Sequence, residues 1–166
     1  MATETSLLLH LKLLLLLGVA NGGPLFGHTF FRERFSQPLD AGVRFFDGRP
    51  LFGPSKTIRG LLLALLLTPV AAVLLGLEAS TGVLVGFFAM LGDLASSFTK
   101  RRLGMASSSQ AFGLDQIPEC LFPLLAVRER YGLDIGEVGL LVVVFVILEL
   151  LLSRLLFKLR LRDQPY

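Results

Sequence analysis

The sequence predicts an all-α protein that crosses a membrane several times within one domain. Two features of composition support this: 53% of the 166 residues are hydrophobic, and only 17% are charged, whereas soluble domains average about 25% charged residues. A third is the grouping of the apolar residues into five stretches, each near the roughly 20 residues that a helix needs to cross a bilayer. We therefore expect residues 1–166 to form a single polytopic domain with five transmembrane helices.

The first predicted span covers residues 7–30 and is the least regular of the five. An apolar run from Leu7 to Ala20 is followed by Asn21-Gly22-Gly23-Pro24, so we expect a retained helix with a kink at Pro24. A cleaved signal peptide is the alternative. It is disfavoured because the first residues carry Glu4 and no Lys or Arg.

The remaining spans are predicted at 58–77, 80–99, 112–127 and 138–157. The second follows a glycine-bounded turn, and the third is apolar except for Asp93 near its end. The fourth is short and contains Glu119 and two prolines, so we expect it to lie against other helices rather than lipid. The fifth contains Glu149, which we rank with Glu119 below the aspartates as a site residue.

The distribution of positive charge predicts the orientation. Of the 16 Lys and Arg residues, 13 lie in the 31–60 loop with its flanks, the 100–111 loop or the C-terminal tail. The positive-inside rule then places the N-terminus outside the cell membrane, and both large loops and the C-terminus in the cytoplasm. The chain has one cysteine, Cys120, and two distant histidines. A thiol or histidine metal site is therefore not expected.

Asp93 is the first candidate site residue. It interrupts an apolar segment and shares one helix face with Ser97 and Lys100, at spacings of four and seven residues. A carboxylate in hydrocarbon is costly unless it faces a cavity, a cation or a partner helix. Simple pairing with an interior cation is the structural alternative, and we favour a functional carboxylate that binds a metal ion.

Asp115 is the second candidate carboxylate. Taken alone, Asp115 before Gln116-Ile117-Pro118 is typical of a helix N-cap. Beside Asp93 at the same membrane face, it can instead complete a paired metal site, with Gln116 as a polar neighbour that orients a ligand. Mg²⁺ typically takes one or two carboxylates and completes its coordination with phosphates and water.

Two cationic motifs at this face are candidates for binding phosphate. Lys56, Thr57 and Arg59 lie at the start of a predicted helix, where backbone N–H groups favour anions. The segment does not match a Walker motif, because Ser55 replaces the required glycine. The second motif is Lys100-Arg101-Arg102, which is also a topogenic anchor. The structural alternative for the first motif is a solvated loop with a snorkelling arginine.

Several short motifs follow one another along the chain between residues 20 and 122. They are Ala20-Asn21 with Pro24, Pro38-Leu39-Asp40, Asp47-Gly48-Arg49, Gly53-x-x-Lys56-Thr57-x-Arg59-Gly60, Gly92-Asp93 with Ser97-Phe98-x-Lys100-Arg101-Arg102-x-Gly104, and Leu114-Asp115-Gln116. Together they resemble the CDP-archaeol synthases, membrane cytidylyltransferases related to the CDP-diacylglycerol synthases.

The resemblance implies that CMP is transferred from CTP to a phosphorylated lipid, with Mg²⁺ as cofactor and release of pyrophosphate. Asp93 and Asp115 would bind the metal and, with Lys100, form the catalytic set. The implied substrate-binding residues are Asn21, Lys56, Thr57, Arg59, Ser97, Arg101 and Gln116. The family often has another acidic residue soon after Asp115-Gln116, where this chain has Ile117-Pro118-Glu119. The sequence therefore leaves the lipid acceptor open.

A non-catalytic transporter or binding protein for an anionic lipid headgroup is the alternative function. Transporters more often show internal repeats and polar residues on both sides of the membrane midplane. Here the polar groups gather at one face, which favours the enzyme. The expected partners are CTP, a phosphorylated lipid and membrane lipids, without nucleic acid. The sequence leaves a homo-oligomer open.

Overall fold

The structure is a computed structural model that describes residues 2–31 and 36–158. This part of the chain forms five α-helices and two isolated β-bridges. The helices are α1 (Ala2–Phe31), α2 (Ile58–Leu74), α3 (Ala79–Arg102), α4 (Gln116–Tyr131) and α5 (Ile135–Lys158). The prediction of an all-α architecture is confirmed.

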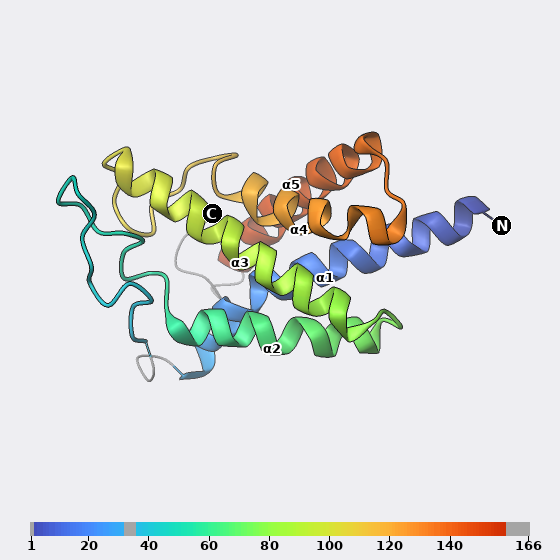
Figure 1. Ribbon diagram of the computed structural model, residues 1–166, viewed down its shortest axis with the longest axis horizontal. Coiled ribbons are helices and arrows are strands. Elements are labelled where there is room, and N and C mark those ends of the chain that lie inside the picture. Colours follow the sequence, from blue (N-terminus) through green and yellow to red (C-terminus); the bar gives the residue numbers. More distant parts are fainter. Residues whose placement is uncertain (1, 32–35, 159–166) are drawn as a thin grey trace.

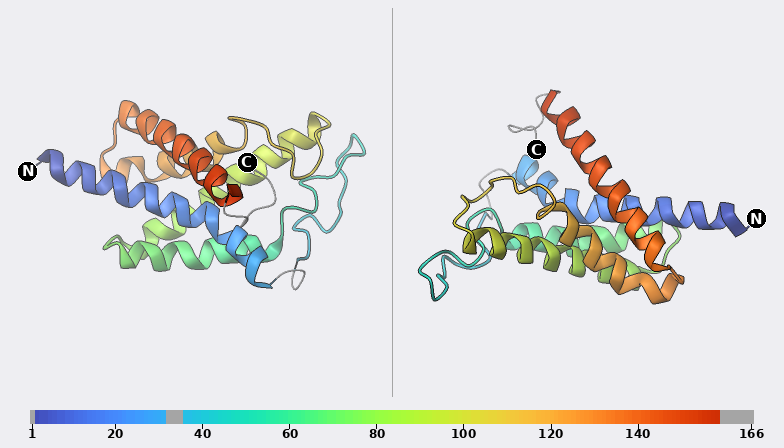
Figure 2. Two further views of the ribbon diagram at one scale, coloured as in Figure 1. Left: turned by 180° about the vertical axis from the view of Figure 1, so that it is seen from behind. Right: turned by 90° about the horizontal axis from the view of Figure 1, so that it is seen from above.

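Each helix overlaps its predicted span, and the bounds differ by a few residues. As expected for a kink at Pro24, this residue lies inside α1, and the last turns of α1 point away from the line of its first part (Figure 2). Helix α4 begins and ends four residues later than the predicted span 112–127. Its start is delayed because residues 111–115 form a turn in which Gly113 has a φ of 78°. Gly132, in the left-handed region, ends it.

Three helical segments of the described residues are long and apolar enough to cross a membrane: Ser6–Pro24, Ala79–Arg102 and Ile135–Lys158. Helix α2 is apolar but has only 17 residues, and α4 has 16. A helix of 17 residues is about 25 Å long, slightly less than the hydrocarbon thickness of about 30 Å. Crossing by α2 and α4 therefore stays a prediction.

Helix α3 is central and packs against α1, α2 and α4 (Figure 1). Two of its glycines allow direct backbone contact with neighbouring helices. A Cβ at Gly82 would lie 2.4 Å from Cα of Pro69 in α2, and a Cβ at Gly92 would lie 2.2 Å from the carbonyl oxygen of Pro118 in α4. Small residues permit such close approach between membrane helices.

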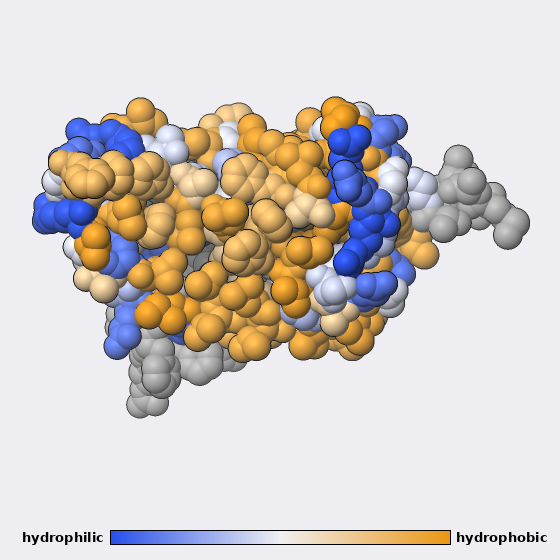
Figure 3. Space-filling view, in the orientation of Figure 1, coloured by the Kyte–Doolittle hydropathy of each residue, from blue (hydrophilic) through white to orange (hydrophobic). Residues whose placement is uncertain are grey.

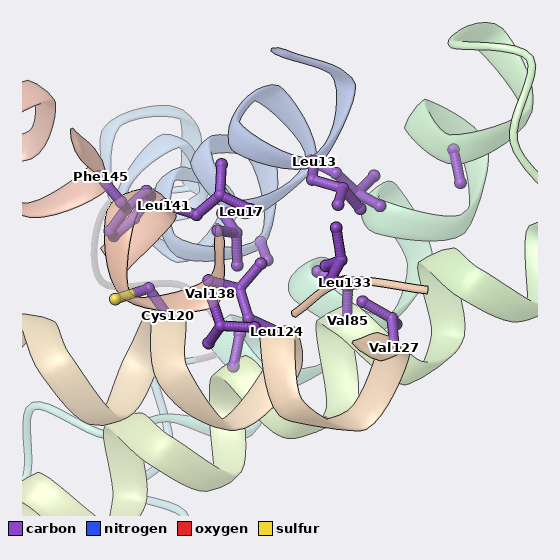
Figure 4. Packing of buried hydrophobic residues seen from close by; sticks show 14 residues of the cluster. Leu13, Leu17, Val85, Cys120, Leu124, Val127, Leu133, Val138, Leu141 and Phe145 are labelled. Carbon is purple, nitrogen blue, oxygen red and sulfur yellow. The ribbon is translucent and has the colours of Figure 1, made fainter. Parts of the chain in front are cut away.

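The buried core draws on all five helices, with Leu17, Val85, Leu124 and Val138 among its members. Figure 4 shows side chains from α1, α3, α4 and α5 meeting in this cluster. On the surface, a broad apolar band separates two polar margins (Figure 3). One margin lies at the end of the bundle that carries the 36–57 and 103–115 loops, and the N-terminus lies at the other (Figure 1). Polar chemistry can therefore gather at the loop end.

Candidate functional site

A polar cavity of about 230 Å³ lies at the loop end of the bundle. Its walls come from the end of the 36–57 loop, from α3, from the 103–115 loop and from α4 and α5. Seven of the ten predicted site residues line it: Lys56, Asp93, Ser97, Lys100, Arg101, Asp115 and Gln116. The structure thus brings together residues from three separate motifs.

A second cavity of about 110 Å³ adjoins the first and shares Ser55, Lys56 and Asp93 with it. It contains the predicted residues Thr57 and Arg59. The rest of its lining is largely apolar and comes from α1, α2, α3 and the 36–57 loop: Pro24, Leu39, Gly60, Leu61, Met90 and Leu94. The two cavities therefore meet at Lys56 and Asp93, with polar walls on one side and apolar walls on the other.

Asn21 is the one predicted site residue that lines neither cavity among the described residues. Its side-chain amide donates a hydrogen bond to the Leu17 carbonyl oxygen in the preceding turn of α1, at 3.1 Å. This contact lies within a single helix. A role for Asn21 in substrate binding stays a prediction.

Asp40 organises the loop that presents Lys56. Its carboxylate accepts backbone hydrogen bonds from Gly53 and Phe52 at 2.9 Å and from Gly42 at 3.0 Å. Burial would raise the pKa of this carboxyl, but the three backbone bonds outweigh burial and lower the pKa below its ordinary value. The loop is closed by a hydrogen bond of 2.7 Å from the Leu39 N–H to the Lys56 carbonyl oxygen.

Lys56 and Thr57 connect this loop to α2. Thr57 is the N-cap of α2, and its hydroxyl oxygen accepts a hydrogen bond from the Gly60 N–H at 3.1 Å. The Lys56 ammonium forms an ion pair with Asp93 on α3. Burial would lower the pKa of Lys56, but Asp93 first, and then Glu119 and Asp115, raise it above its ordinary value. Lys56 therefore stays protonated and faces several carboxylates.

Lys100 and Arg101 at the end of α3 bind the 103–115 loop. Lys100 forms an ion pair with Asp115 and donates to the Ser109 carbonyl oxygen at 2.9 Å. Arg101 donates to the Ala106 carbonyl oxygen at 2.7 Å. Arg101 is only 4% exposed, yet its Nε is a buried donor without a hydrogen-bond partner in the described part of the chain. A buried, unsatisfied guanidinium nitrogen is suited to an anionic ligand.

Asp115 occupies the N-cap position of α4, but its side chain makes no capping hydrogen bond. Its carboxylate instead accepts from the Ala111 N–H at 2.8 Å and pairs with Lys100. The Gln116 side-chain oxygen accepts from the Gly113 N–H at 3.0 Å. The Asp115 carboxylate thus lies in the cavity wall and does not cap the helix.

Two glutamates that sequence reasoning ranked low also line the polar cavity, Glu119 and Glu149. Glu119 is hydrogen-bonded to Asp93. The close approach of Gly92 to the backbone at Pro118 and Glu119 brings these two carboxyl groups together. The sequence did contain one indication that Glu119 belongs to the site. It follows Asp115 by four residues, a spacing that places both side chains on one side of α4.

The acidic residues fit a magnesium ion in type and number. In the described ranges no three His, Cys, Asp or Glu side chains converge as a ready-made metal cage. Mg²⁺ does not need one, because it usually binds through one or two carboxylates and the substrate phosphates. Asp93 and Asp115 are hard oxygen donors in the wall of one cavity. Each is balanced here by a lysine.

Comparison with known proteins identifies one family. A family model described as CarS-like CDP-archaeol synthase matches residues 34–166. The CDP-archaeol synthase of Sulfurisphaera tokodaii is 36% identical over 135 residues, which cover 78% of this chain and 81% of the relative. That of Saccharolobus solfataricus is 39% identical over 123 residues, which cover 70% of each.

One solved structure is also similar, with a TM-score of 0.73 at 31% identity. The match covers 86% of this chain and 90% of the other, which is described as an intramembrane enzyme for archaeal membrane lipid biosynthesis. These matches confirm the resemblance found in the motifs. They favour an enzyme over the alternative of a non-catalytic transporter or binding protein.

Proposed function

Since this chain belongs to the CDP-archaeol synthase family, and is thus an integral membrane enzyme that uses CTP to cytidylylate a lipid phosphate, we propose that the two adjoining cavities form its active site. The observation that supports this is the meeting of both cavities at Lys56 and Asp93. In this proposal the polar cavity takes the triphosphate of CTP. The apolar cavity, with Arg59 in its wall, takes the phosphate-bearing end of the lipid.

The reaction needs little acid–base chemistry from the protein. An oxygen of the lipid phosphate attacks the α-phosphorus of CTP and forms a new P–O bond. The bond between the α-phosphorus and its bridging oxygen breaks, and pyrophosphate leaves with the electron pair. Because the attacking phosphate is already ionised near neutral pH, catalysis reduces to in-line positioning and neutralisation of charge.

The cations of the site have distinct parts in this scheme. Lys100 and Arg101 hold the triphosphate, whose oxygens replace the loop carbonyls that these side chains bind in the free protein. Lys56, at the boundary of the two cavities, neutralises charge near the reacting phosphorus. Arg59 can bind the lipid phosphate with two parallel hydrogen bonds. Thr57, Ser97 and Gln116 add neutral hydrogen-bonding groups to the walls.

Asp93 and Asp115 would hold Mg²⁺ in this proposal. When bound, the ion would supply Lewis-acid neutralisation of charge on the α-phosphate and the leaving pyrophosphate. Both aspartates are paired with lysines in the free protein. In the complex, the lysines would be free to bind phosphate oxygens while the aspartates would hold the metal, so the charges of the site would stay balanced. We place the site on the cytoplasmic side, where CTP is present.

Purified enzyme with labelled CTP, Mg²⁺ and a panel of phosphorylated lipids tests the proposal. The panel contains a dialkyl glycerol ether phosphate with isoprenoid chains and a diacylglycerol phosphate. We expect a CDP-lipid from the ether acceptor, and a loss of at least about a hundredfold in kcat for Asp93→Asn. Asp134→Asn is the matched control: Asp134 precedes α5 and accepts a hydrogen bond from the Glu137 N–H at 2.7 Å, which an asparagine side chain can also accept.

Three results would contradict the proposal. The substrate assignment fails if no lipid in the panel yields a CDP-lipid. The site assignment fails if Asp93→Asn retains the activity of the wild type, or if a chelator of divalent ions leaves the rate unchanged.

A further inference from the structure

Residues 43–51 form a hairpin that projects from the loop end of the bundle (Figure 1). Its two sides are joined by hydrogen bonds from the Leu51 N–H to the Val43 carbonyl oxygen at 3.0 Å and from the Phe45 N–H to the Arg49 carbonyl oxygen at 2.8 Å. Its turn contains Gly48, with a φ of 75°. None of these residues lines either cavity, so the hairpin is outside the site described above.

The hairpin and the end of α3 hold each other through two arginines. The Arg49 guanidinium donates to the backbone carbonyl oxygens of Arg101, at 3.3 Å, and Arg102. In return, the Arg102 guanidinium donates to the carbonyl oxygens of Arg49, at 3.3 Å, and Pro50. The last carbonyls of a helix have no partner within the helix. The Arg101 carbonyl oxygen also accepts from the Gly104 N–H, at 3.1 Å, and Arg49 adds a side-chain donor to it and to the Arg102 carbonyl oxygen. Arg49 therefore helps to fix the terminal turn of α3.

Further contacts of the Arg102 side chain strengthen this connection. Its guanidinium forms an ion pair of 3.1 Å with Asp47. It also lies 4.7 Å from the ring centroid of Phe45 in the hairpin and 4.9 Å from that of Phe98 in α3, at cation–π distances. The Arg102 side chain thus binds the hairpin, whereas Lys100 and Arg101 line the polar cavity.

Where the chain leaves α3, it passes beside the Arg49 guanidinium. Gly104 has a φ of 76°. A Cβ at this position would lie 3.4 to 3.5 Å from the guanidinium atoms of Arg49. The Met105 N–H then bonds back to the Lys100 carbonyl oxygen at 3.0 Å. The backbone of Lys100 and Arg101 is therefore held from the hairpin side by Arg49 and from the loop side by Met105.

We propose that Arg49 is a positioning residue for nucleotide binding: by holding the terminal carbonyls of α3, it directs the Lys100 and Arg101 side chains to the triphosphate. This rests on the proposed function, because it assigns the triphosphate to these two cations. It explains the division of the tribasic run, in which two residues serve the cavity and the third docks the hairpin. It also gives the Asp47-Gly48-Arg49 motif a function at a distance from the substrate.

The test compares Arg49→Gln with Arg44→Gln in purified enzyme. Arg44 lies in the same hairpin, but its guanidinium donates to the Gly48 carbonyl oxygen, at 2.8 Å, within the hairpin rather than to α3, so this control removes the same charge without loosening α3. Two quantities are measured for each variant: the dissociation constant of magnesium CTP without a lipid acceptor, and the KM values for CTP and lipid during turnover.

For Arg49→Gln we expect the dissociation constant and the KM for CTP to rise about tenfold, since small displacements of binding groups have effects of this order. The KM for the lipid stays near the wild-type value, and Arg49→Lys restores part of the affinity because an ammonium can still donate to a carbonyl. Arg44→Gln leaves CTP binding unchanged.

Three results would overturn the proposal. An equal rise in both glutamine variants would show a loss of general electrostatic attraction instead. A lower thermal unfolding midpoint with unchanged CTP binding would make the contact merely structural. A parallel rise in the lipid KM would mean that Arg49 acts on the whole site. Failure of the proposed function is distinguishable, because it appears as absent CDP-lipid formation in the wild type.

Discussion

The Asp40 carboxylate accepts three backbone hydrogen bonds within a loop that has almost no regular secondary structure. Two of the donors, Phe52 and Gly53, precede Lys56 by a few residues. Gly53 also lies against the side chain of Arg101, since a Cβ there would be 3.2 Å from a guanidinium nitrogen. Asp40 therefore affects the position of two cations without touching the cavity.

We predict that Asp40→Ala destabilises the protein by about 1–3 kcal/mol, the cost of leaving buried donors unsatisfied. Thermal unfolding midpoints in detergent measure this loss, and cleavage within the 36–57 loop by an added protease reports it locally. Cleavage should become faster in the variant, whereas Gln37→Ala, which removes an exposed side chain from the same loop, should leave it unchanged. Equal cleavage rates for all three proteins would contradict the prediction.

The lowered pKa of Asp40 also predicts a pH dependence. A carboxyl group whose pKa is lowered by folding stabilises the folded state above its ordinary value of 3.8, and this stabilisation is lost as the pH falls through the folded-state pKa. The difference in unfolding midpoint between wild type and Asp40→Asn should therefore be full at pH 7 and shrink below about pH 3.8. A difference that is constant down to pH 3 would contradict this assignment.

At the scale of elements, the contact between α3 and α4 connects packing to the site. Gly92 touches the backbone of Pro118, and the next residue on each helix, Asp93 and Glu119, meets its counterpart at the cavity. Gly82 makes a similar contact with Pro69 of α2, nearer the other end of α3. Comparison of these two glycines separates helix packing from the geometry of the site.

We predict that Gly92→Ala destabilises the protein by about 1–3 kcal/mol, the usual cost of overpacking, and also lowers kcat. The added Cβ would lie 2.2 Å from a backbone oxygen, so α4 must move and carry Glu119 and Asp115 with it. Gly82→Ala should lower stability with a smaller effect on kcat. Gly139→Ala in α5 is the neutral control, because no atom lies within 4 Å of its added Cβ.

Unfolding midpoints and CDP-lipid formation are measured on the same preparations. If Gly82→Ala and Gly92→Ala lower kcat equally at matched stability, the contact at Gly92 has no specific part in the site. If Gly92→Ala unfolds at the wild-type midpoint, the backbones of α3 and α4 do not lie as close together at Gly92 and Pro118 as described above.

The sequence predicted much of the helical arrangement because apolar runs of about 20 residues have few alternatives in a membrane protein. The start of α4 was misplaced, since Ala111, Phe112 and Leu114 are apolar yet belong to a turn at Gly113. Apolar composition alone cannot distinguish a turn from the first turn of a helix.

The site shows the same division. The gathering of Lys56, Asp93, Lys100 and Asp115 at one end followed from counting charges along the chain. Pairing of Asp93 with an interior cation was one of the alternatives, but the identity of the partners, Lys56 for Asp93 and Lys100 for Asp115, did not follow, because it depends on how α2, α3 and α4 rotate about their axes. The commitment of Arg102 to the hairpin likewise requires contacts with residues about 52 positions away.

For the whole molecule, the two polar margins differ in what they do. The loop end carries both cavities. At the other end, Arg130 donates to the hydroxyl groups of Ser80 and Thr81 at 2.6 and 3.0 Å, and Thr81 also bonds the Tyr131 hydroxyl at 2.8 Å. These contacts join the start of α3 to the end of α4. We therefore assign a structural role to this margin, whereas the loop end carries the proposed active site.

The last prediction concerns which helices cross the membrane. Helix α2 spans about 25 Å, but a helix slightly shorter than the bilayer core can cross at a modest cost through local thinning. We predict that α2 and α4 both cross, with the loop end in the cytoplasm. Single cysteines placed at exposed positions test this: Phe46 and Ala79 lie on either side of α2, whereas Phe112 precedes α4 and Glu129 lies in its last turn. The native Cys120 is fully buried, so the unaltered chain is the control for background labelling.

A membrane-impermeant maleimide should label Ala79→Cys and Glu129→Cys in intact cells, and Phe46→Cys and Phe112→Cys only in inside-out vesicles. Labelling of Phe46→Cys and Ala79→Cys from the same side would mean that α2 enters the membrane without crossing it. The same result for the second pair would exclude crossing by α4. A complete reversal of sides would keep five spans but place the catalytic end outside, which the lack of CTP there makes incompatible with activity. The labelling of these four cysteine variants thus tests both the orientation predicted by the positive-inside rule and the side of the membrane on which the active site lies.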